Sequence, residues 1–193
     1  MLLEIKAPAK INLHLRVLGR RNDGFHEIQT LLQTIDLADD LRASVAPPEV
    51  LELRVHPAGI LPSSDDNLVL RAAQALRHHA GVEHGARLEL SKRIPIGAGL
   101  GGGSSDAAAA LVLLDELWGL HVGPAVLLDL AAGLGSDVPF FLTGGLAMAT
   151  GRGEIIRPLP NLGDYGVVVC APPIEVSTAD VYGRLAARSG LTA

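Results

Sequence analysis

The sequence predicts an α+β fold with an aliphatic core, and three observations carry this prediction. Hydrophobic residues make up 48% of the 193 residues but aromatic residues only 3%, so aliphatic side chains must form the core. The every-second-residue apolar pattern of strands occurs at 11–17, 51–55 and 88–92. Helical apolar spacing with capping signals occurs at 68–80, 107–118 and 124–132. A chain of this length and composition can enclose a substantial core.

The first predicted strand is amphipathic. Its apolar residues occupy every second position, at Ile11, Leu13, Leu15 and Val17. The polar residues between them include Lys10 and Asn12, which should point the same way from the open face of the strand. A turn over 19–24 follows, and mixed apolar spacing resumes over 25–35.

Between residues 51 and 92 the predicted order is strand, helix, strand. The strand at 51–55 alternates apolar and charged residues. The helix over 68–80 follows a polar run, with Asn67 as its N-cap and Gly81 as its stop. The short strand at 88–92 leads directly into a cluster of glycines.

Two helices and a strand are predicted after this cluster. The helix over 107–118 presents one apolar stripe, formed by Leu111, Leu114 and Trp118. The helix over 124–132 has a proline near its start and should end at Gly133. A strand at 146–149 and a glycine turn at 151–153 complete this part of the chain.

The prolines at 158 and 160 mark a predicted domain boundary. The apolar run 166–171 is typical of a strand buried on both faces, and a capped helix is expected over about 177–188. The predicted domains are residues 1–157 and residues 158–193.

Charge, cysteine content and hydropathy exclude several classes of protein. A net charge of -5 argues against a broad basic surface for nucleic acid. The single cysteine, Cys170, excludes a disulfide framework and is expected to be an inert core residue. His78, His79 and His84 lack metal-ligand spacing and are expected in solvent. With no early apolar run and no stretch of about 18 apolar residues, we expect a cytoplasmic protein without a membrane or nucleic-acid partner. The oligomeric state is not predicted.

The strongest local motif is the segment 95–106, in which five of the seven positions from 97 to 103 are glycine. Glycines allow close backbone approach, and the free N–H groups of a helix beginning near Ser104 and Ser105 would attract phosphate. We interpret the segment as a polyphosphate cradle. The alternative is a glycine-rich tight turn capped by serine.

Two familiar phosphate-binding patterns fit this segment poorly. A Walker loop is excluded because no lysine follows the last glycine before the helix ends. The dinucleotide pattern is present at Gly97, Gly99 and Gly102, but its acidic partner, expected about 20 residues later, would fall on Asp115 or Glu116 within a predicted helix.

Two further residues are candidates for catalysis. Asp137 is a lone carboxylate in an apolar stretch, where it could accept a proton from a substrate hydroxyl or, alternatively, cap a helix. Lys10, paired with Asp137, would place positive charge near a transferring phosphoryl group. The alternative for Lys10 is a solvated lysine on an edge strand.

Three separated segments, 8–13, 95–109 and 134–141, together resemble the small-molecule kinase superfamily that includes galactokinase, homoserine kinase, mevalonate kinase and phosphomevalonate kinase. Within it, Asp23–Thr30 is similar to a segment of the family that phosphorylates 4-diphosphocytidyl-2-C-methyl-D-erythritol. This resemblance implies an N-terminal domain like ribosomal protein S5 domain 2 and a ferredoxin-like C-terminal domain, here only partly present. It also implies ATP-dependent phosphorylation of the substrate 2-hydroxyl, in the non-mevalonate route to isoprenoids.

The resemblance assigns roles to individual residues. Lys10 and Asp137 become the catalytic pair, and Asn12 helps to position the substrate phosphates. His26 hydrogen-bonds the cytosine ring of a cytidine diphosphate substrate, with Phe25 stacked on one side, where the family more often has tyrosine, and Tyr182 on the other. The implied ATP site is Pro95, Ile96, Gly97, Ala98, Gly99, Leu100, Gly101, Gly102, Gly103, Ser104 and Ser105. Magnesium is implied as well, with ligands that the sequence does not assign.

The chain departs from the family at its C-terminal end. Members carry a longer C-terminal domain with another glycine-rich segment, so we expect this chain to be C-terminally incomplete. Two other functions remain open: a different kinase of the same superfamily, and a nucleotide-binding fragment without catalysis.

Overall fold

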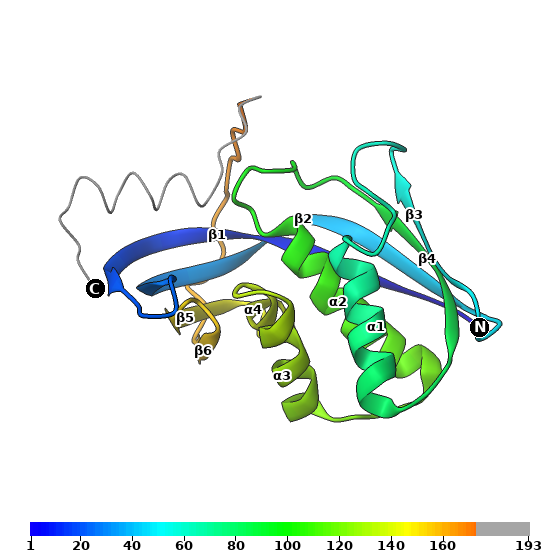
Figure 1. Cartoon of the computed structure of the whole chain (residues 1–193). Helices are drawn as coiled ribbons and strands as arrows, with labels where there is room; N and C mark the ends of the chain where they lie inside the picture. The colour runs from blue at the N-terminus through cyan, green and yellow to red at the C-terminus, as the bar shows by residue number, and fades with distance from the viewer. Residues whose placement is uncertain (173–193) are drawn as a thin grey trace.

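A computed structural model describes residues 1–172 and confirms the predicted α+β class. Six strands form one sheet in the order β3-β4-β2-β5-β6, with β1 paired along β2, and the helices lie on one face (Figure 1). The strands are β1 (Leu2–Arg20), β2 (His26–Ala46), β3 (Leu51–His56), β4 (Gly85–Ser91), β5 (Leu146–Gly151) and β6 (Ile155–Leu159). The helices are α1 (Leu68–Ala80), α2 (Gly102–Trp118), α3 (Pro124–Leu134) and α4 (Val138–Thr143).

The long β1–β2 pair does not alternate as the sequence predicts. The register shifts between Asn12 and His14, where Leu13 is an extra residue in β1, and also between Pro8 and Lys10. Such bulges re-aim side chains. Leu13 and Leu15 are 40% and 46% exposed, whereas Lys10 is buried. The expectation of a continuous buried apolar face is therefore wrong, and Lys10, expected on the open face of the strand, is covered.

Helices α1 and α2 form the core against the sheet. The Asn67 side chain accepts a hydrogen bond from the Val69 amide at the start of α1, and Gly81 ends the helix in the left-handed conformation, as predicted. Helix α2 begins at Gly102, five residues before its predicted start, because the last glycines of the cluster adopt helical geometry. Its predicted stripe, Leu111, Leu114 and Trp118, is buried.

Helices α3 and α4 both pack against α2, and α4 also contacts strand β6. Helix α3 continues through Gly133, its predicted stop, and ends at Leu134. The short helix α4 begins directly after Asp137 and buries Val138, Pro139 and Phe140. These helices bring Asp137 to the inner side of the sheet.

The chain beyond β6 differs from its prediction. Strand β6 extends to Leu159, so the predicted boundary after residue 157 falls inside this strand. Residues 166–171 form no strand, Val168 is 96% exposed and Cys170 is exposed. Their predicted burial is wrong because no neighbouring strand within residues 1–172 pairs with them. The predicted helix over 177–188 lies outside the described residues.

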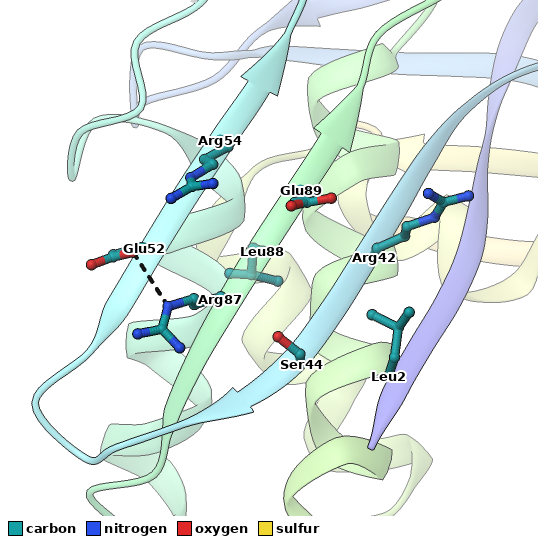
Figure 2. A pocket seen from close by; sticks show the side chains of 8 residues that line it. All are labelled: Leu2, Arg42, Ser44, Glu52, Arg54, Arg87, Leu88 and Glu89. Carbon is teal, nitrogen blue, oxygen red and sulfur yellow. Dashed lines mark ion pairs between the residues drawn. The ribbon is translucent and has the colours of Figure 1, made fainter.

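The outer face of the sheet carries alternating charges rather than a helical layer (Figure 2). Arg42 contacts Glu4 across β1 and β2 with a nitrogen–oxygen distance of 3.2 Å, and Arg87 contacts Glu52 across β4 and β3 at 3.6 Å. Arg42, Arg87 and Glu52 border a shallow hollow of about 260 Å³. Its lining has three arginines and two glutamates, and the predicted site residues within the described range do not line it.

Among residues 1–172, no helix combines the length and apolar character that crossing a membrane requires.

Candidate active site

Lys10 and Asp137 lie side by side although 126 residues separate them in the chain. Lys10 Nζ is 3.4 Å from Asp137 Oδ2, and the two side chains are 8% and 36% exposed. A solvated edge lysine would be far more exposed, so that alternative is excluded. The arrangement holds a nearly buried ammonium against a carboxylate that solvent or a ligand can reach.

A chain of hydrogen bonds orients the Lys10 ammonium. Lys10 Nζ donates to Asn12 Oδ1 at 2.8 Å, and Asn12 Nδ2 donates to Thr30 Oγ1 at 2.8 Å. Thr30 Oγ1 in turn donates to the carbonyl oxygen of His14 at 2.7 Å. Asn12 and Lys10 thus point the same way, as predicted, and Asn12 positions the lysine. Thr30 is part of this chain, and no pattern in the sequence pointed to it.

Asp137 stands at the N-cap position of α4, yet its side chain makes no capping hydrogen bond. The alternative role as a helix cap is therefore not what the carboxylate does. The β5–β6 turn approaches it from another side, since a Cβ added at Gly153 would lie 3.7 Å from Asp137 Oδ1. Asp137 is enclosed by Lys10 and this turn, with one third of its side chain open.

The glycine-rich segment reaches the same place from α2. Gly97, Gly99 and Gly101 have positive φ angles of 71°, 73° and 72°. At Gly101 an added Cβ would lie 2.7 Å from Phe141 Cζ and 3.0 Å from Lys10 Cγ, so only glycine fits. The Lys10 amide also donates to the Leu100 carbonyl at 2.9 Å. The structure thus joins the loop directly to the Lys10 backbone.

The predicted ATP-site residues divide into an exposed rim and a covered base. Residues 95–99 are exposed, Leu100 and Ser105 are buried, and Ser104 is half-buried. Gly101 precedes α2 without a side-chain cap, so the first amides of this 17-residue helix depend on other partners. Such amides suit an anion. In the described chain, the buried Ser105 Oγ has no hydrogen-bond partner.

Phe25 and His26 lie at the turn that joins β1 to β2. Phe25 is 49% exposed and His26 is half-buried. The guanidinium carbon of Arg152 lies 4.7 Å from the centre of the Phe25 ring, a cation–π contact that sequence reasoning missed. Arg152 belongs to the same β5–β6 turn as Gly153, so one turn contacts Phe25 and comes close to Asp137. Tyr182 lies outside the described residues.

A buried charge cluster, formed by Asp39, Lys92 and Asp106, lies beneath the glycine-rich loop. Lys92 Nζ donates to Asp39 Oδ2 and, at 2.7 Å, to Asp106 Oδ2. The three side chains are 0–4% exposed. Burial raises the pKa of Asp106 to about 7; nearby Lys92 opposes this rise and Asp39 adds to it. Sequence reasoning missed the cluster, although Lys92 and Asp106 flank the loop.

Comparisons with known proteins agree on one family. The model of the GHMP kinases N terminal domain matches residues 67–145. A 4-diphosphocytidyl-2-C-methyl-D-erythritol kinase of Prochlorococcus marinus is 45% identical over 187 residues, covering 96% of this chain and 60% of the relative. The enzyme of the same name from Pelotomaculum thermopropionicum is 50% identical over 182 residues, covering 94% and 63%. The chain thus spans about 60% of the length of these relatives.

Solved structures give the same result. The crystal structure of a 4-(cytidine 5'-diphospho)-2C-methyl-D-erythritol kinase matches with a TM-score of 0.67 and 46% identity, over 81% of this chain and 55% of that chain. A homoserine kinase from Cytophaga hutchinsonii matches with a TM-score of 0.69 at 22% identity, over 94% and 59%, which shows a shared fold.

Proposed function

Since this chain belongs to the GHMP kinases, we propose that it carries the ATP-binding and catalytic part of a kinase that phosphorylates the 2-hydroxyl of 4-diphosphocytidyl-2-C-methyl-D-erythritol. The observation that carries the proposal is the contact of Lys10 with Asp137 beside the glycine-rich loop. The names of relatives at 45% and 50% identity favour this substrate over other small alcohols.

Asp137 acts as the base in the proposed reaction. Its carboxylate takes the proton of the substrate hydroxyl while the hydroxyl oxygen forms a bond to the γ-phosphorus of ATP. The bond from that phosphorus to the bridging β–γ oxygen breaks, and ADP leaves with the electron pair. The open third of the Asp137 side chain is where the hydroxyl would approach.

Lys10 orients this base and stabilises the charge that develops on the transferring phosphoryl group. Its own position is set by Asn12 and Thr30, so the ammonium cannot swing away into solvent. The loop over 95–105 holds the triphosphate through backbone amides, and catalysis is mostly positioning and electrostatics. Magnesium would arrive bound to the phosphates of ATP, as is usual for kinases.

The hairpin end holds the cytidine part of the substrate. Phe25 would stack on the cytosine ring and His26 would hydrogen-bond it, and the half-exposed Phe25 ring suits this role. The Arg152 guanidinium lies over one face of the Phe25 ring. The cytosine would therefore have to stack on the other face or displace Arg152. Asn12 as a phosphate contact and Tyr182 as the second stacking ring remain predictions.

We further propose that the residues through Leu159, the end of β6, form the nucleotide-binding and catalytic domain and that the residues after it begin a substrate-binding domain, which moves the predicted boundary after residue 157 to the end of this strand. The continuity of the sheet through β5 and β6 supports the first part. A cytoplasmic location also remains a prediction.

The test is a coupled assay for ADP release with three alcohols: the cytidyl substrate, mevalonate and homoserine. We expect turnover with the cytidyl substrate alone. Turnover with mevalonate or homoserine instead would assign the chain to another kinase of the superfamily. ATP binding without turnover on any of the three would leave a nucleotide-binding protein and contradict the proposed catalysis.

A further inference from the structure

We propose that Asp39, Lys92 and Asp106 act as positioning residues that hold the two ends of the glycine-rich loop in the geometry that receives the ATP phosphates. The identity of the ligand, ATP, rests on the proposed function, whereas the geometry comes from the buried charge cluster itself.

The cluster joins three parts of the chain that would otherwise move separately. Lys92 follows β4 at the start of the loop, Asp106 lies in the second turn of α2 after the loop, and Asp39 belongs to β2. The Lys92 ammonium contacts both carboxylates. One side chain therefore ties the beginning of the loop to its end and both to the sheet.

Asp39 also fixes the backbone at the start of the loop. Its Oδ1 accepts hydrogen bonds from the amide of Arg93 and, at 2.9 Å, from the amide of Ile94. The far end of the loop is held separately by the bond from the Lys10 amide to the Leu100 carbonyl. The exposed residues 95–99 therefore lie between two backbone positions, Ile94 and Leu100, that hydrogen bonds hold in place.

The Lys92 ammonium also lies directly beneath the start of α2. A Cβ added at Gly102 would be only 3.1 Å from Lys92 Nζ. Because Asp39 and Asp106 neutralise this ammonium, its contribution here is to hold the backbone where helix amides would meet phosphate, rather than to supply net positive charge. This lysine precedes the loop in sequence, whereas the lysine of a Walker loop follows the glycines.

Stability alone gives a poor account of this cluster. Buried ion pairs are often no more stabilising than apolar residues of similar volume, because desolvation opposes the attraction. Two carboxylates here share one ammonium, and Asp106 Oδ1 and Ser105 Oγ are buried without hydrogen-bond partners among the described residues. A set of groups retained for fold stability alone would satisfy these atoms.

The main test replaces Lys92 with methionine, which keeps the length of the side chain and removes the charge. We expect Lys92→Met to raise the KM for ATP, and the Kd for a non-hydrolysable imidotriphosphate analogue of ATP, by about tenfold or more. The KM for the alcohol substrate should change by less than about twofold, since the loop does not contact it in the proposed arrangement.

The matched control is Arg93→Met, because Arg93 is the next residue and its exposed guanidinium contacts Asp40 rather than the cluster. It changes the net charge equally and should alter the Kd for the analogue by less than about twofold. Asp106→Asn is the conservative variant. It keeps an oxygen for Lys92 Nζ, so it should bind the analogue within about threefold of wild type.

Amide hydrogen exchange over residues 95–101 gives a readout that needs no nucleotide. We expect faster exchange in Lys92→Met and wild-type exchange in Arg93→Met. If wild type binds no nucleotide while exchange changes as expected, the proposed function fails and the positioning role stands. If folded Lys92→Met shows wild-type exchange and wild-type affinity, the positioning role is refuted.

Lys92→Met leaves two buried carboxylates without their cation and so risks misfolding. In that case Lys92→Met/Asp106→Asn, which removes one carboxylate together with the ammonium, is measured in the same two ways. The same increases in Kd and exchange rate are expected, and their absence would overturn the proposal.

Discussion

Replacing Asp106 with asparagine should change how the stability of the protein depends on pH. Burial raises the pKa of Asp106 from 3.8 to about 7; nearby Lys92 opposes this rise, and Asp39 makes a smaller contribution in its favour. Below about pH 4 the carboxyl is neutral in both the folded and the unfolded protein. Between about pH 4 and pH 7 the unfolded chain ionises it while the folded protein keeps the proton. Stability is therefore lost as pH rises through this window.

The magnitude follows from the difference in proton affinity. Each factor of ten is worth about 1.4 kcal/mol, so a rise from 3.8 to about 7 corresponds to roughly 4 kcal/mol of unfolding free energy lost by pH 8. Asparagine does not titrate. The unfolding free energy of Asp106→Asn relative to wild type should therefore increase by that amount, roughly 4 kcal/mol, between pH 4 and pH 8.

Urea unfolding of both proteins across this pH range measures the difference directly. Titrating groups outside the cluster are common to the two proteins and cancel, so the difference reports on Asp106 together with its partners Asp39 and Lys92. The control is Asp66→Asn, an exposed aspartate outside the cluster, for which the difference from wild type should stay flat. A flat difference for Asp106→Asn, or one that falls as pH rises, would refute the argument that burial favours the neutral carboxyl.

Four further predictions concern the proposed active site. Asp137→Asn should lower kcat by about a hundredfold or more while the Kd for an ATP analogue changes by less than about threefold. Asn12→Ala frees the Lys10 ammonium and should lower kcat by about tenfold, a smaller loss, in the same assay. Gly101→Ala places a Cβ 2.7 Å from a Phe141 ring atom at a positive φ, and should lower the free energy of unfolding in urea by roughly 2 kcal/mol or more. Phe25→Ala should raise the KM for the cytidyl substrate about tenfold with little change in kcat.

Each of these has a matched control. Asp129→Asn removes an exposed carboxylate on α3 and should leave kcat unchanged; an equal loss in both aspartate variants would contradict the role of Asp137. Thr30→Ser keeps the hydroxyl that supports Asn12. Gly99→Ala has the same backbone conformation as Gly101→Ala but meets nothing within 4 Å, so equal destabilisation would show that the clash is unimportant. Phe25→Tyr should retain substrate affinity, because a phenol ring still stacks.

The sequence predicts well those features that depend on local chemistry. The bounds of α1 follow from Asn67 and Gly81, whose capping conformations need only their own neighbours. The glycine-rich loop is found in the same way, because its conformation requires glycine at positions such as Gly101. The shared direction of Lys10 and Asn12 also follows from strand periodicity alone.

Features that depend on distant partners could not be predicted from the residues. Whether Lys10 is solvated or buried is decided by Asp137 and α2, and the register shifts of β1 have no sequence signature of their own. The cluster beneath the loop needs Asp39, which lies 53 residues before Lys92 in the chain. The run 166–171 has the composition of a buried strand, but burial requires a neighbour as well as a composition.

Because Leu13 is an extra residue in β1, the geometry of the strand beside Asn12 depends on the number of residues in the strand as well as on their identity. Leu13 separates Asn12 from His14, and Thr30 fastens both by accepting from the Asn12 side chain and donating to the His14 carbonyl. Deleting Leu13 would leave the charge and nearly all of the composition intact, yet Asn12 and His14 would then pair with Leu32 and Leu31 as consecutive residues, and the bend that a bulge gives the strand beside Asn12 would be lost.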